Sequence, residues 1–220
     1  MSLYSRLFWR APSAMKETKE NFLSEALGDL LTRLSQPEAR QFIENILLKS
    51  IRHQSWVAQF MLGLDGKQLV WETQYRIIAP NKSFDRRKPD LVLFADRCPM
   101  LVVEAKVDAA TDEDQLQAYG SWLAHEARAS CRHTAVVLLL DRGREPECAG
   151  LQSITGSGLQ HIGFVRWSDV RIWLQGGTSA GTSQPARELW LSLGQELADF
   201  MNEIGVGATS VKADPAKGLS

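Results

Sequence analysis

The sequence is poor in cysteine and histidine, and both shortages exclude classes of site. Its three cysteines, Cys98, Cys131 and Cys148, are too few and too scattered for a disulfide framework or a zinc site, so we expect reduced thiols. The histidines likewise have no close ligand spacing: they are His53, His125, His133 and His161. Any metal site should therefore be of a kind other than zinc.

The chain also lacks a long apolar run and an excess of either charge. No run reaches membrane-spanning length and the first residues lack the apolar core of a signal peptide, which predicts a cytoplasmic protein with no membrane partner. The 220 residues carry 25 basic and 26 acidic side chains, a net charge of -1. Nucleic-acid binding would therefore have to use a local patch.

Breaks in the hydrophobic pattern divide the chain into one main domain, 17–174, and shorter appendages. Residues 1–16 have no clear period and are expected to form an arm that docks on the body or on a partner. Gly, Ser and Thr dominate 175–184, which predicts a flexible link. Helical spacing returns over 185–204, and 205–220 has no apolar pattern and should be disordered.

Within the main domain, apolar periodicity predicts helices and strands in a mixed order. The expected helices are 17–34, 36–49 (opened by a capping box, Ser35 to Glu38), 56–64, 111–127 and 169–174. The expected strands are 69–78, 91–95, 100–107, 134–140 and 160–167. This order predicts an α/β (α+β) fold in which helices flank a mixed central β-sheet.

Three ionisable residues, Asp90, Glu104 and Lys106, lie on or beside two apolar runs that read as a β-hairpin. Side chains alternate along a strand, so Glu104 and Lys106 share a face. Asp90 joins them only if the register allows it. A three-residue loop places Asp90 opposite Lys106, whereas a four-residue loop places it opposite Ala105, and we therefore expect an odd loop or a bulge.

The chemistry of such a cluster suits hydrolysis of a phosphodiester. Two converging carboxylates repel each other, and a hard divalent cation with oxygen ligands, such as magnesium, removes that repulsion. A bound cation activates water and stabilises charge on a phosphoryl group. A neighbouring ammonium group adds positive charge and orients the attacking water.

The same residues resemble a known family. Pro89-Asp90, thirteen intervening residues and Glu104-Ala105-Lys106 resemble the signature of the PD-(D/E)XK nuclease superfamily. The stretch Gln115 to Tyr119 is similar to the Gln-hydrophobic-x-x-Tyr element of its RecB-type branch. Asn21 to Leu27 resembles the first helix of bacterial members, whose acidic residue joins the metal site. The likeness runs from about Glu20 to about Leu174.

This resemblance implies a restriction-endonuclease-like core and a metal-dependent nuclease, with DNA as the expected substrate and restriction, repair or phage defence as the expected setting. The catalytic set that it implies is Asp90, Glu104, Lys106, Gln115 and Tyr119. The ligands that it implies for Mg2+ (or Mn2+) are Asp90, Glu104, Glu25 and the carbonyl of Ala105. In this scheme Lys106 acts on water, Gln115 supports it, and Tyr119 orients Gln115 or contacts phosphate.

Other interpretations of these residues stay open. Glu25 falls on the polar side of its helix, so periodicity favours a solvated glutamate, with Asp29 in reserve. The basic run Arg86, Arg87 and Lys88 is either a solvated loop or a contact to the nucleic-acid backbone beside Asp90. The whole fold can also be a silent module that binds nucleic acid or a partner protein, with its charges satisfied by salt bridges, or a hydrolase of small nucleotides. A homodimer is equally open.

Overall fold

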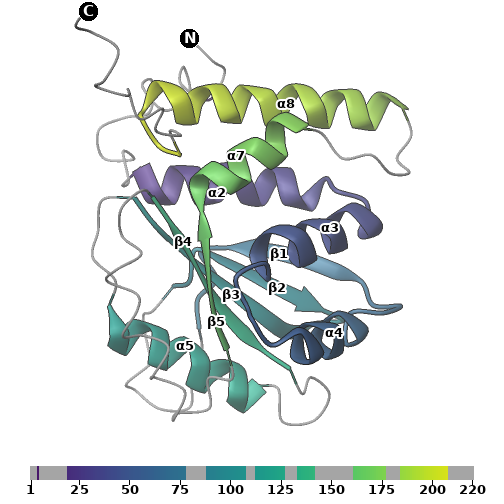
Figure 1. The fold of residues 1–220 in the computed structure, drawn as a ribbon, viewed down its shortest axis with the longest axis vertical. Helices are drawn as coiled ribbons and strands as arrows, with labels where there is room; N and C mark the ends of the chain where they lie inside the picture. Colours follow the sequence, from purple (N-terminus) through teal and green to yellow (C-terminus); the bar gives the residue numbers. More distant parts are fainter. Residues whose placement is uncertain are drawn as a thin grey trace, which may run out of the picture.

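A five-stranded mixed sheet forms the centre of the computed structural model, which describes residues 4, 19–77, 88–107, 112–126, 133–141, 161–176 and 184–207 (Figure 1). The strands are β1 (Leu69–Thr73), β2 (Leu91–Ala95), β3 (Cys98–Lys106), β4 (Ala135–Leu140) and β5 (His161–Arg166). The helices are α2 (Lys19–Thr32), α3 (Gln36–Phe42), η2 (Ile43–Leu47), α4 (Gln54–Leu62), α5 (Glu113–Glu126), α7 (Trp167–Gly176) and α8 (Gln184–Glu203). The expected arm, apart from Tyr4, most of the expected link and the tail beyond 207 lie outside the described residues.

The strands lie in the order β1-β2-β3-β4-β5. The first three are antiparallel neighbours, whereas β3, β4 and β5 are parallel. A parallel pair needs a crossover, and α5 lies in the connection from β3 to β4. The expectation of a mixed sheet flanked by helices is thus confirmed.

The β2–β3 hairpin contains the bulge that the sequence led us to expect. Asp96 and Arg97 form its two-residue connection, and both have positive φ, at 50° and 69°. The pairing shifts between Leu93 and Phe94, so that Leu91 pairs with Val103. A two-residue loop alone would place Asp90 opposite Val103, on the other face of the sheet from Glu104 and Lys106. The bulge inserts one extra residue into β3 and so returns Asp90 to their face.

The register differs by two residues from the one predicted for a three-residue loop. Continuing the pairing beyond Leu91 and Val103 places Asp90 opposite Glu104, not opposite Lys106. A shift of two residues leaves every side chain on its original face, because the strand repeat is two residues. Asp90, Glu104 and Lys106 therefore share one face of the sheet.

Three local expectations need correction. The strand expected over 69–78 ends at Thr73, because Gln74 turns the backbone to a φ of 48°. The helix expected over 36–49 has its capping box at Ser35 and Glu38 but continues after α3 as the π-helical η2. Cys98 is disulfide-bonded, so the expectation of reduced thiols is wrong for this residue.

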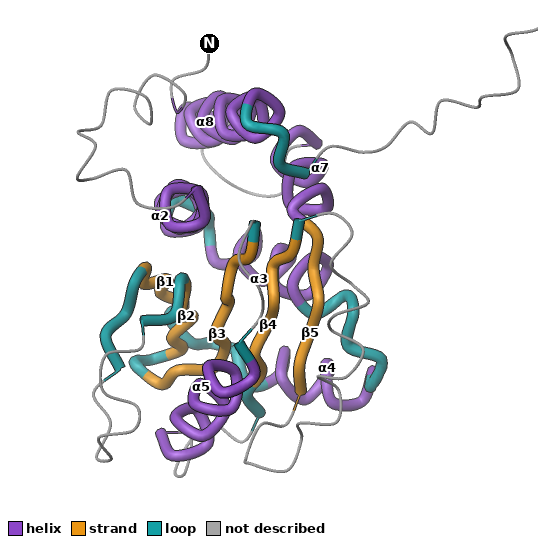
Figure 2. The backbone as a smooth tube through the Cα atoms, turned by 90° about the vertical axis from the view of Figure 1, so that its left-hand side faces the viewer, coloured by secondary structure: helices purple, strands orange, loops and turns teal. Residues whose placement is uncertain are grey.

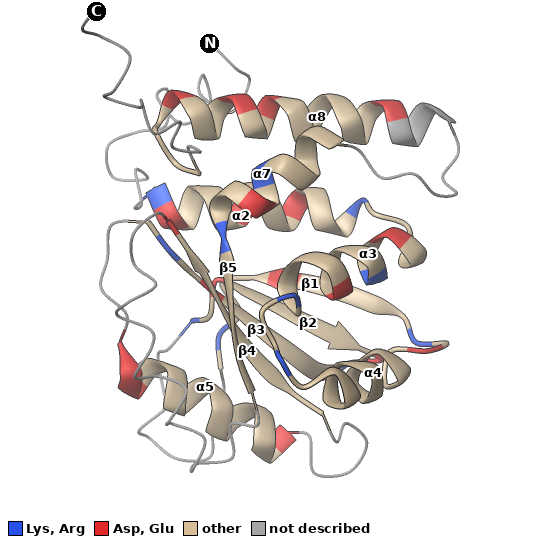
Figure 3. Cartoon of the chain, viewed as in Figure 1, with Lys and Arg blue, Asp and Glu red and all other residues tan. Residues whose placement is uncertain are grey.

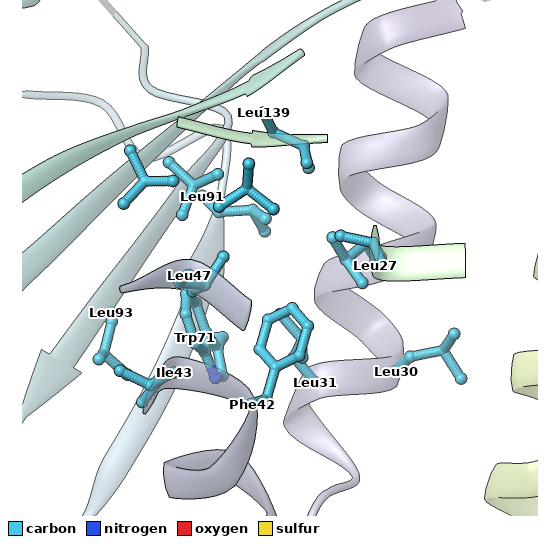
Figure 4. Close-up of a cluster of buried hydrophobic side chains, with 14 of the residues drawn as sticks. Leu27, Leu30, Leu31, Phe42, Ile43, Leu47, Trp71, Leu91, Leu93 and Leu139 are labelled. Carbon is cyan, nitrogen blue, oxygen red and sulfur yellow. The ribbon is translucent and has the colours of Figure 1, made fainter. Parts of the chain in front are cut away.

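Alternate strand residues pack against different helices and so divide the core in two. One cluster joins the sheet to α2, α3, η2, α4, α7 and α8 through Leu91, Leu93, Leu101, Val103, Val137 and Leu139. Figure 4 shows part of it, with Leu27 and Leu31 of α2 beside Phe42 and Trp71. The other cluster joins the sheet to α5 through Val92, Phe94, Val102, Val136, Leu138 and Leu140. The even-numbered residues of β2, and those of β3 from Val102 onward, therefore lie on the α5 side, whereas Met100, next to the bulge, packs on the other side.

The helices on the larger side form two layers. The helices α2 and α7 lie between α8 and the sheet, while α5 is the helix among the described residues that covers the opposite face (Figures 1 and 2). The N-terminal end of α2 reaches the sheet where β3 ends, because Glu20 accepts a hydrogen bond from the N–H of Val107 at 2.7 Å. This arrangement brings α2, the hairpin and α5 to one end of β3.

Candidate active site

Asp90 is the most completely bonded side chain of the site. Its Oδ2 accepts a hydrogen bond from the backbone N–H of Ala105 at 2.8 Å. Its Oδ1 accepts from Gln74 Nε2 at 2.9 Å and from Ser24 Oγ at 3.4 Å. These donors come from β3, the residue after β1 and α2, so a single buried carboxylate connects three elements.

Glu104 and Lys106 form an ion pair within β3. Lys106 Nζ donates to Glu104 Oε1 at 2.7 Å, and the two side chains are only 10% and 4% exposed. Glu104 Oε2 is buried and has no hydrogen-bond partner. Buried polar atoms are nearly always paired in folded proteins, so an orphaned carboxylate oxygen needs an explanation such as an absent ion or water.

Burial shifts the pKa of both carboxyl groups upward. It raises the pKa of Glu104 to about 7, and the neighbouring Asp90 acts in the same direction. It also raises the pKa of Asp90, although the N–H of Ala105, the charge of Lys106 and the amide of Gln74 all favour the carboxylate. Two titratable carboxyls with raised pKa values in one buried cluster are typical of functional sites.

Two opposing effects act on the pKa of Lys106. Burial lowers the pKa of an ammonium group, but the charge of Glu104 and the hydrogen bond to it outweigh burial here. The charges of Glu20 and Asp90 add to this effect, and the net pKa of Lys106 is raised. The ammonium group therefore stays protonated at neutral pH.

The α5 helix brings Gln115 and Tyr119 to this cluster. Asp112 caps the helix, with its Oδ1 accepting from the N–H of Gln115 at 3.2 Å. Gln115 Nε2 donates to the Tyr119 hydroxyl oxygen at 2.7 Å. Burial and the neighbouring charge of Glu104 raise the pKa of Tyr119 above its usual value, whereas the hydrogen bond with Gln115 lowers it. Tyr119 thus relays contact from Gln115 to the carboxylate pair.

The acidic residue that α2 brings to the site is Glu20, not Glu25. Glu25 is exposed, and the reserve candidate Asp29 is exposed and paired with Arg33 at 3.0 Å. Glu20 instead reaches Val107, and its charge acts on the pKa of both Asp90 and Lys106. Glu20 and Ser24 are four residues apart and share a helix face, which is a signal that the sequence already contained.

The remaining predicted residues are placed as follows. Ala105 takes part through its N–H, which bonds Asp90, so the expected role of its carbonyl stays a prediction. Lys88 is exposed two residues before Asp90, while Arg86 and Arg87 lie outside the described residues. Gln74, one residue beyond the end of β1, is half-buried and bonds Asp90. Its left-handed φ is what turns it toward that carboxylate.

The oxygens available to a cation come chiefly from Asp90 and Glu104. Within the described ranges, no group of three or more His, Cys, Asp or Glu side chains is arranged to hold a metal ion. Magnesium, however, is commonly held by one or two carboxylates together with waters and substrate phosphates. The orphaned Oε2 of Glu104 beside the Asp90 carboxylate fits that smaller donor set.

No family model matches the chain, and neither does any curated protein or solved structure. Among the helices of the described residues, none is both long and apolar enough to cross a bilayer. What this protein does must therefore be inferred from the side chains of the site.

Proposed function

We propose that this chain is a magnesium-dependent nuclease of the PD-(D/E)XK kind that hydrolyses phosphodiester bonds of DNA. The observation that carries the proposal is the position of Asp90 beside Glu104, one residue beyond the last strand pair of the hairpin, with Lys106 on the same face. Two buried carboxylates beside one ammonium group are costly to assemble in a core, and their cost calls for a role.

The donor set suits a hard cation. Glu104 Oε2 has no partner, and the Asp90 carboxylate is fixed in place by Ala105, Gln74 and Ser24. When bound there, magnesium would neutralise charge that develops on the phosphoryl group and activate water. Glu20 is the third carboxylate of this proposed site, in the place that the sequence gave to Glu25.

The other side chains have supporting roles. Lys106 supplies a fixed positive charge beside the carboxylates and orients the attacking water. Tyr119 holds the Glu104 carboxylate in position, and Gln115 holds the Tyr119 hydroxyl in turn. Removing a residue that positions a metal ligand commonly lowers metal affinity or activity by about 10- to 100-fold.

The order of elements supports the same family. From α2 to β4 the chain forms the helical segments α2, α3, η2 and α4, then three antiparallel strands, the helix α5 and a strand parallel to β3. This is the mixed sheet flanked by helices that the resemblance implies. All residues that carry the motif resemblance, from Asp90 to Tyr119, meet at one end of β3, although α5 approaches from a different layer than α2.

The test is cleavage of linear and circular DNA and RNA with magnesium, with manganese or with EDTA. We expect metal-dependent cutting by the wild-type chain, and circular substrates separate internal cutting from cutting at ends. Lys106→Met keeps the length of the side chain without its charge and should lower the rate by about 10²–10³-fold. Asp90→Asn and Glu104→Gln keep the shape of the side chains but remove the proposed metal ligands, and each should abolish the metal-dependent cleavage.

Glu25→Gln is the matched control, because it removes one carboxylate from the same helix as Glu20 but at an exposed position. It should cut at the wild-type rate. A wild-type chain that folds, neither cuts nor binds magnesium by calorimetry, and is unchanged by Lys106→Met would overturn the proposal.

The rival is a module that binds nucleic acid without cutting it, and the 2.7 Å ion pair between Lys106 and Glu104 favours it. In that case Lys106 and Glu104 serve only to form the salt bridge, and the site needs no metal ion. Calorimetry separates the two functions, since a nuclease site binds magnesium in the absence of substrate whereas a salt-bridged core does not. DNA binding that is the same in EDTA and in magnesium, without cleavage, would favour the silent module.

A further inference from the structure

A second polar feature lies at the outer edge of the sheet, beside β5. A cavity of about 290 Å³ is lined by residues of η2 and its C-terminal flank, the ends of β4 and β5, and the first turn of α7. Its polar lining comprises Lys49, Ser50, Arg166 and Asp169. Two cations thus face one carboxylate across a hollow at the end of the sheet where the parallel strands finish.

The strand register relates this cavity to the carboxylate cluster. Lys106 pairs with Leu140, and Leu140 pairs with Arg166, so the three residues form one row across three parallel strands. Residues that are paired across parallel strands project to the same face, and each strand step is about 4.8 Å, so Arg166 lies about 10 Å from Lys106 in backbone terms. Leu140 lines the cavity itself.

We propose that the cavity beside β5 binds a backbone phosphate of the nucleic acid whose phosphodiester is cut at the carboxylate cluster, with Arg166 and Lys49 as its cationic contacts. This inference rests on the proposed nuclease function and extends it to the path of the substrate. One strand of B-DNA advances about 3.4 Å along the axis for each phosphate. A separation of about 10 Å therefore places the cavity within a few phosphates of the scissile one.

The charges of the cavity agree with an anionic ligand that arrives from solvent. Lys49 pairs with Asp169 at 3.8 Å, a long distance for an ion pair, and the Lys49 side chain is 66% exposed. An exposed pair of this kind contributes little to stability, so Lys49 is able to turn toward a phosphate at small cost. Ser50 Oγ accepts from the N–H of Phe164 at 2.6 Å, and its hydroxyl hydrogen is available for a phosphate oxygen.

The opposite flank of the cluster is basic as well. Lys88 is exposed just before β2, whereas Arg166 is exposed at the end of β5. In the sheet order β3, which carries Glu104, lies between β2 and β5, and Asp90 directly precedes β2. Charged residues are sparse along the middle of the strands and lie mainly at the strand ends (Figure 3). Phosphate contacts on both flanks would fix the register of a strand laid across this end of the sheet without reading its sequence.

The experiment measures the salt dependence of binding, which counts phosphate contacts independently of cleavage. Anisotropy of a labelled DNA duplex is recorded in EDTA over a range of KCl concentrations for the wild type, Arg166→Ala, Lys49→Ala and Arg97→Ala. Arg97 is the matched control, because it is an exposed cation at the other end of the β2–β3 hairpin. Loss of one phosphate contact lowers the slope of log K against log [salt] by about 1.

We expect this loss for Arg166→Ala and for Lys49→Ala, no loss for Arg97→Ala, and tighter binding for Asp169→Asn, which removes the competing carboxylate. Equal slopes for the wild type, Arg166→Ala, Lys49→Ala and Arg97→Ala, with wild-type DNA binding intact, would overturn the phosphate-pocket proposal. The proposed nuclease function would then still stand. Slopes that depend on Arg166 and Lys49 in a chain that never cuts DNA would support the phosphate pocket and overturn the nuclease function. A wild type that does not bind DNA at all would overturn both.

Discussion

Lys106 Nζ donates a 2.7 Å hydrogen bond to Glu104 Oε1 within a single strand, while the other oxygen of that carboxylate has no partner. The ion pair therefore provides a hydrogen bond to one oxygen of the Glu104 carboxylate and none to the other. Lys106 supplies one positive charge beside the two carboxylates of Asp90 and Glu104. Because the negative charge is only partly balanced, the stability of the protein and its response to pH both depend on Glu104.

Removing one member of the pair should destabilise the fold more than removing both. Lys106→Met leaves a buried carboxylate without its cation, at a cost of about 3–5 kcal/mol where a buried pair is broken. The double variant Lys106→Met/Glu104→Gln removes both charges and should recover much of that loss. Urea denaturation of the two single variants and the double variant measures the coupling.

The same cycle has a pH signature. The carboxyl of Glu104 takes up a proton readily, since its pKa is already raised to about 7, so the cost of Lys106→Met should be smaller at pH 6 than at pH 8. Additive single and double variants at both pH values would contradict this coupling.

The metal-free protein should become less stable as the pH rises from about 4.5 to about 7. Between the ordinary pKa of 4.5 and the folded value of about 7, the folded chain holds a proton on Glu104 that the unfolded chain has released. Stability is thus greatest below this window and is lost as the pH passes through it, by on the order of 3 kcal/mol at most. Denaturation midpoints in EDTA across the window measure the effect.

Glu104→Gln is the control for this pH dependence, because it cannot titrate and should flatten the profile in the same window. Magnesium should oppose the trend, since a cation binds the ionised carboxylate and displaces its proton. Wild-type and Glu104→Gln profiles that run parallel in EDTA would show that Glu104 titrates normally.

Glu20 and Glu25 provide a matched comparison on one helix. Glu20→Gln keeps an acceptor for the N–H of Val107 but removes a charge that acts on Asp90 and Lys106. We expect magnesium affinity, measured by calorimetry, to fall by about tenfold or more. Glu25→Gln changes an exposed residue and should match the wild type. Equal affinities in both variants would place Glu20 outside the metal site.

Tyr119→Phe tests the link between α5 and the carboxylates. It deletes the hydroxyl that accepts from Gln115 and interacts with Glu104, at a stability cost of about 1 kcal/mol. The cleavage rate should fall by about tenfold, and Gln115→Ala should show a similar loss. Gln117→Ala, at an exposed position of the same helix, is the control. A Tyr119→Phe protein that cuts as fast as the wild type would limit Tyr119 to packing.

Much of the site could be predicted because strand alternation is a strong rule. Placing Asp90 on the face of Glu104 and Lys106 required an odd loop or a bulge, and the hairpin contains a bulge. The register itself could not be predicted. It depends on left-handed φ values at Asp96 and Arg97, and neither residue is the Gly or Asn that usually signals such a turn.

Other features depend on contacts that the sequence separates widely. The family resemblance assigned the metal ligand on α2 to Glu25, although periodicity placed that residue on the polar side, whereas Glu20 is positioned by the N–H of Val107, far away in the chain. The strand β1 was predicted too long because alternation continues past Thr73, although the backbone turns at Gln74 to reach Asp90. Tertiary contacts of the Glu20 and Asp90 carboxylates thus override the local sequence pattern.

The short connection between β2 and β3 also has a consequence for the order of folding. Two residues join these strands, so closing the hairpin costs little chain entropy, whereas β4 pairs with β3 only after a crossover that includes α5. Asp90, Glu104 and Lys106 all belong to this hairpin or its immediate flank. We therefore expect Lys106 to meet the carboxylates early, before α5 and β4 dock and exclude water, so that Glu104 already has its cation when the cluster is buried.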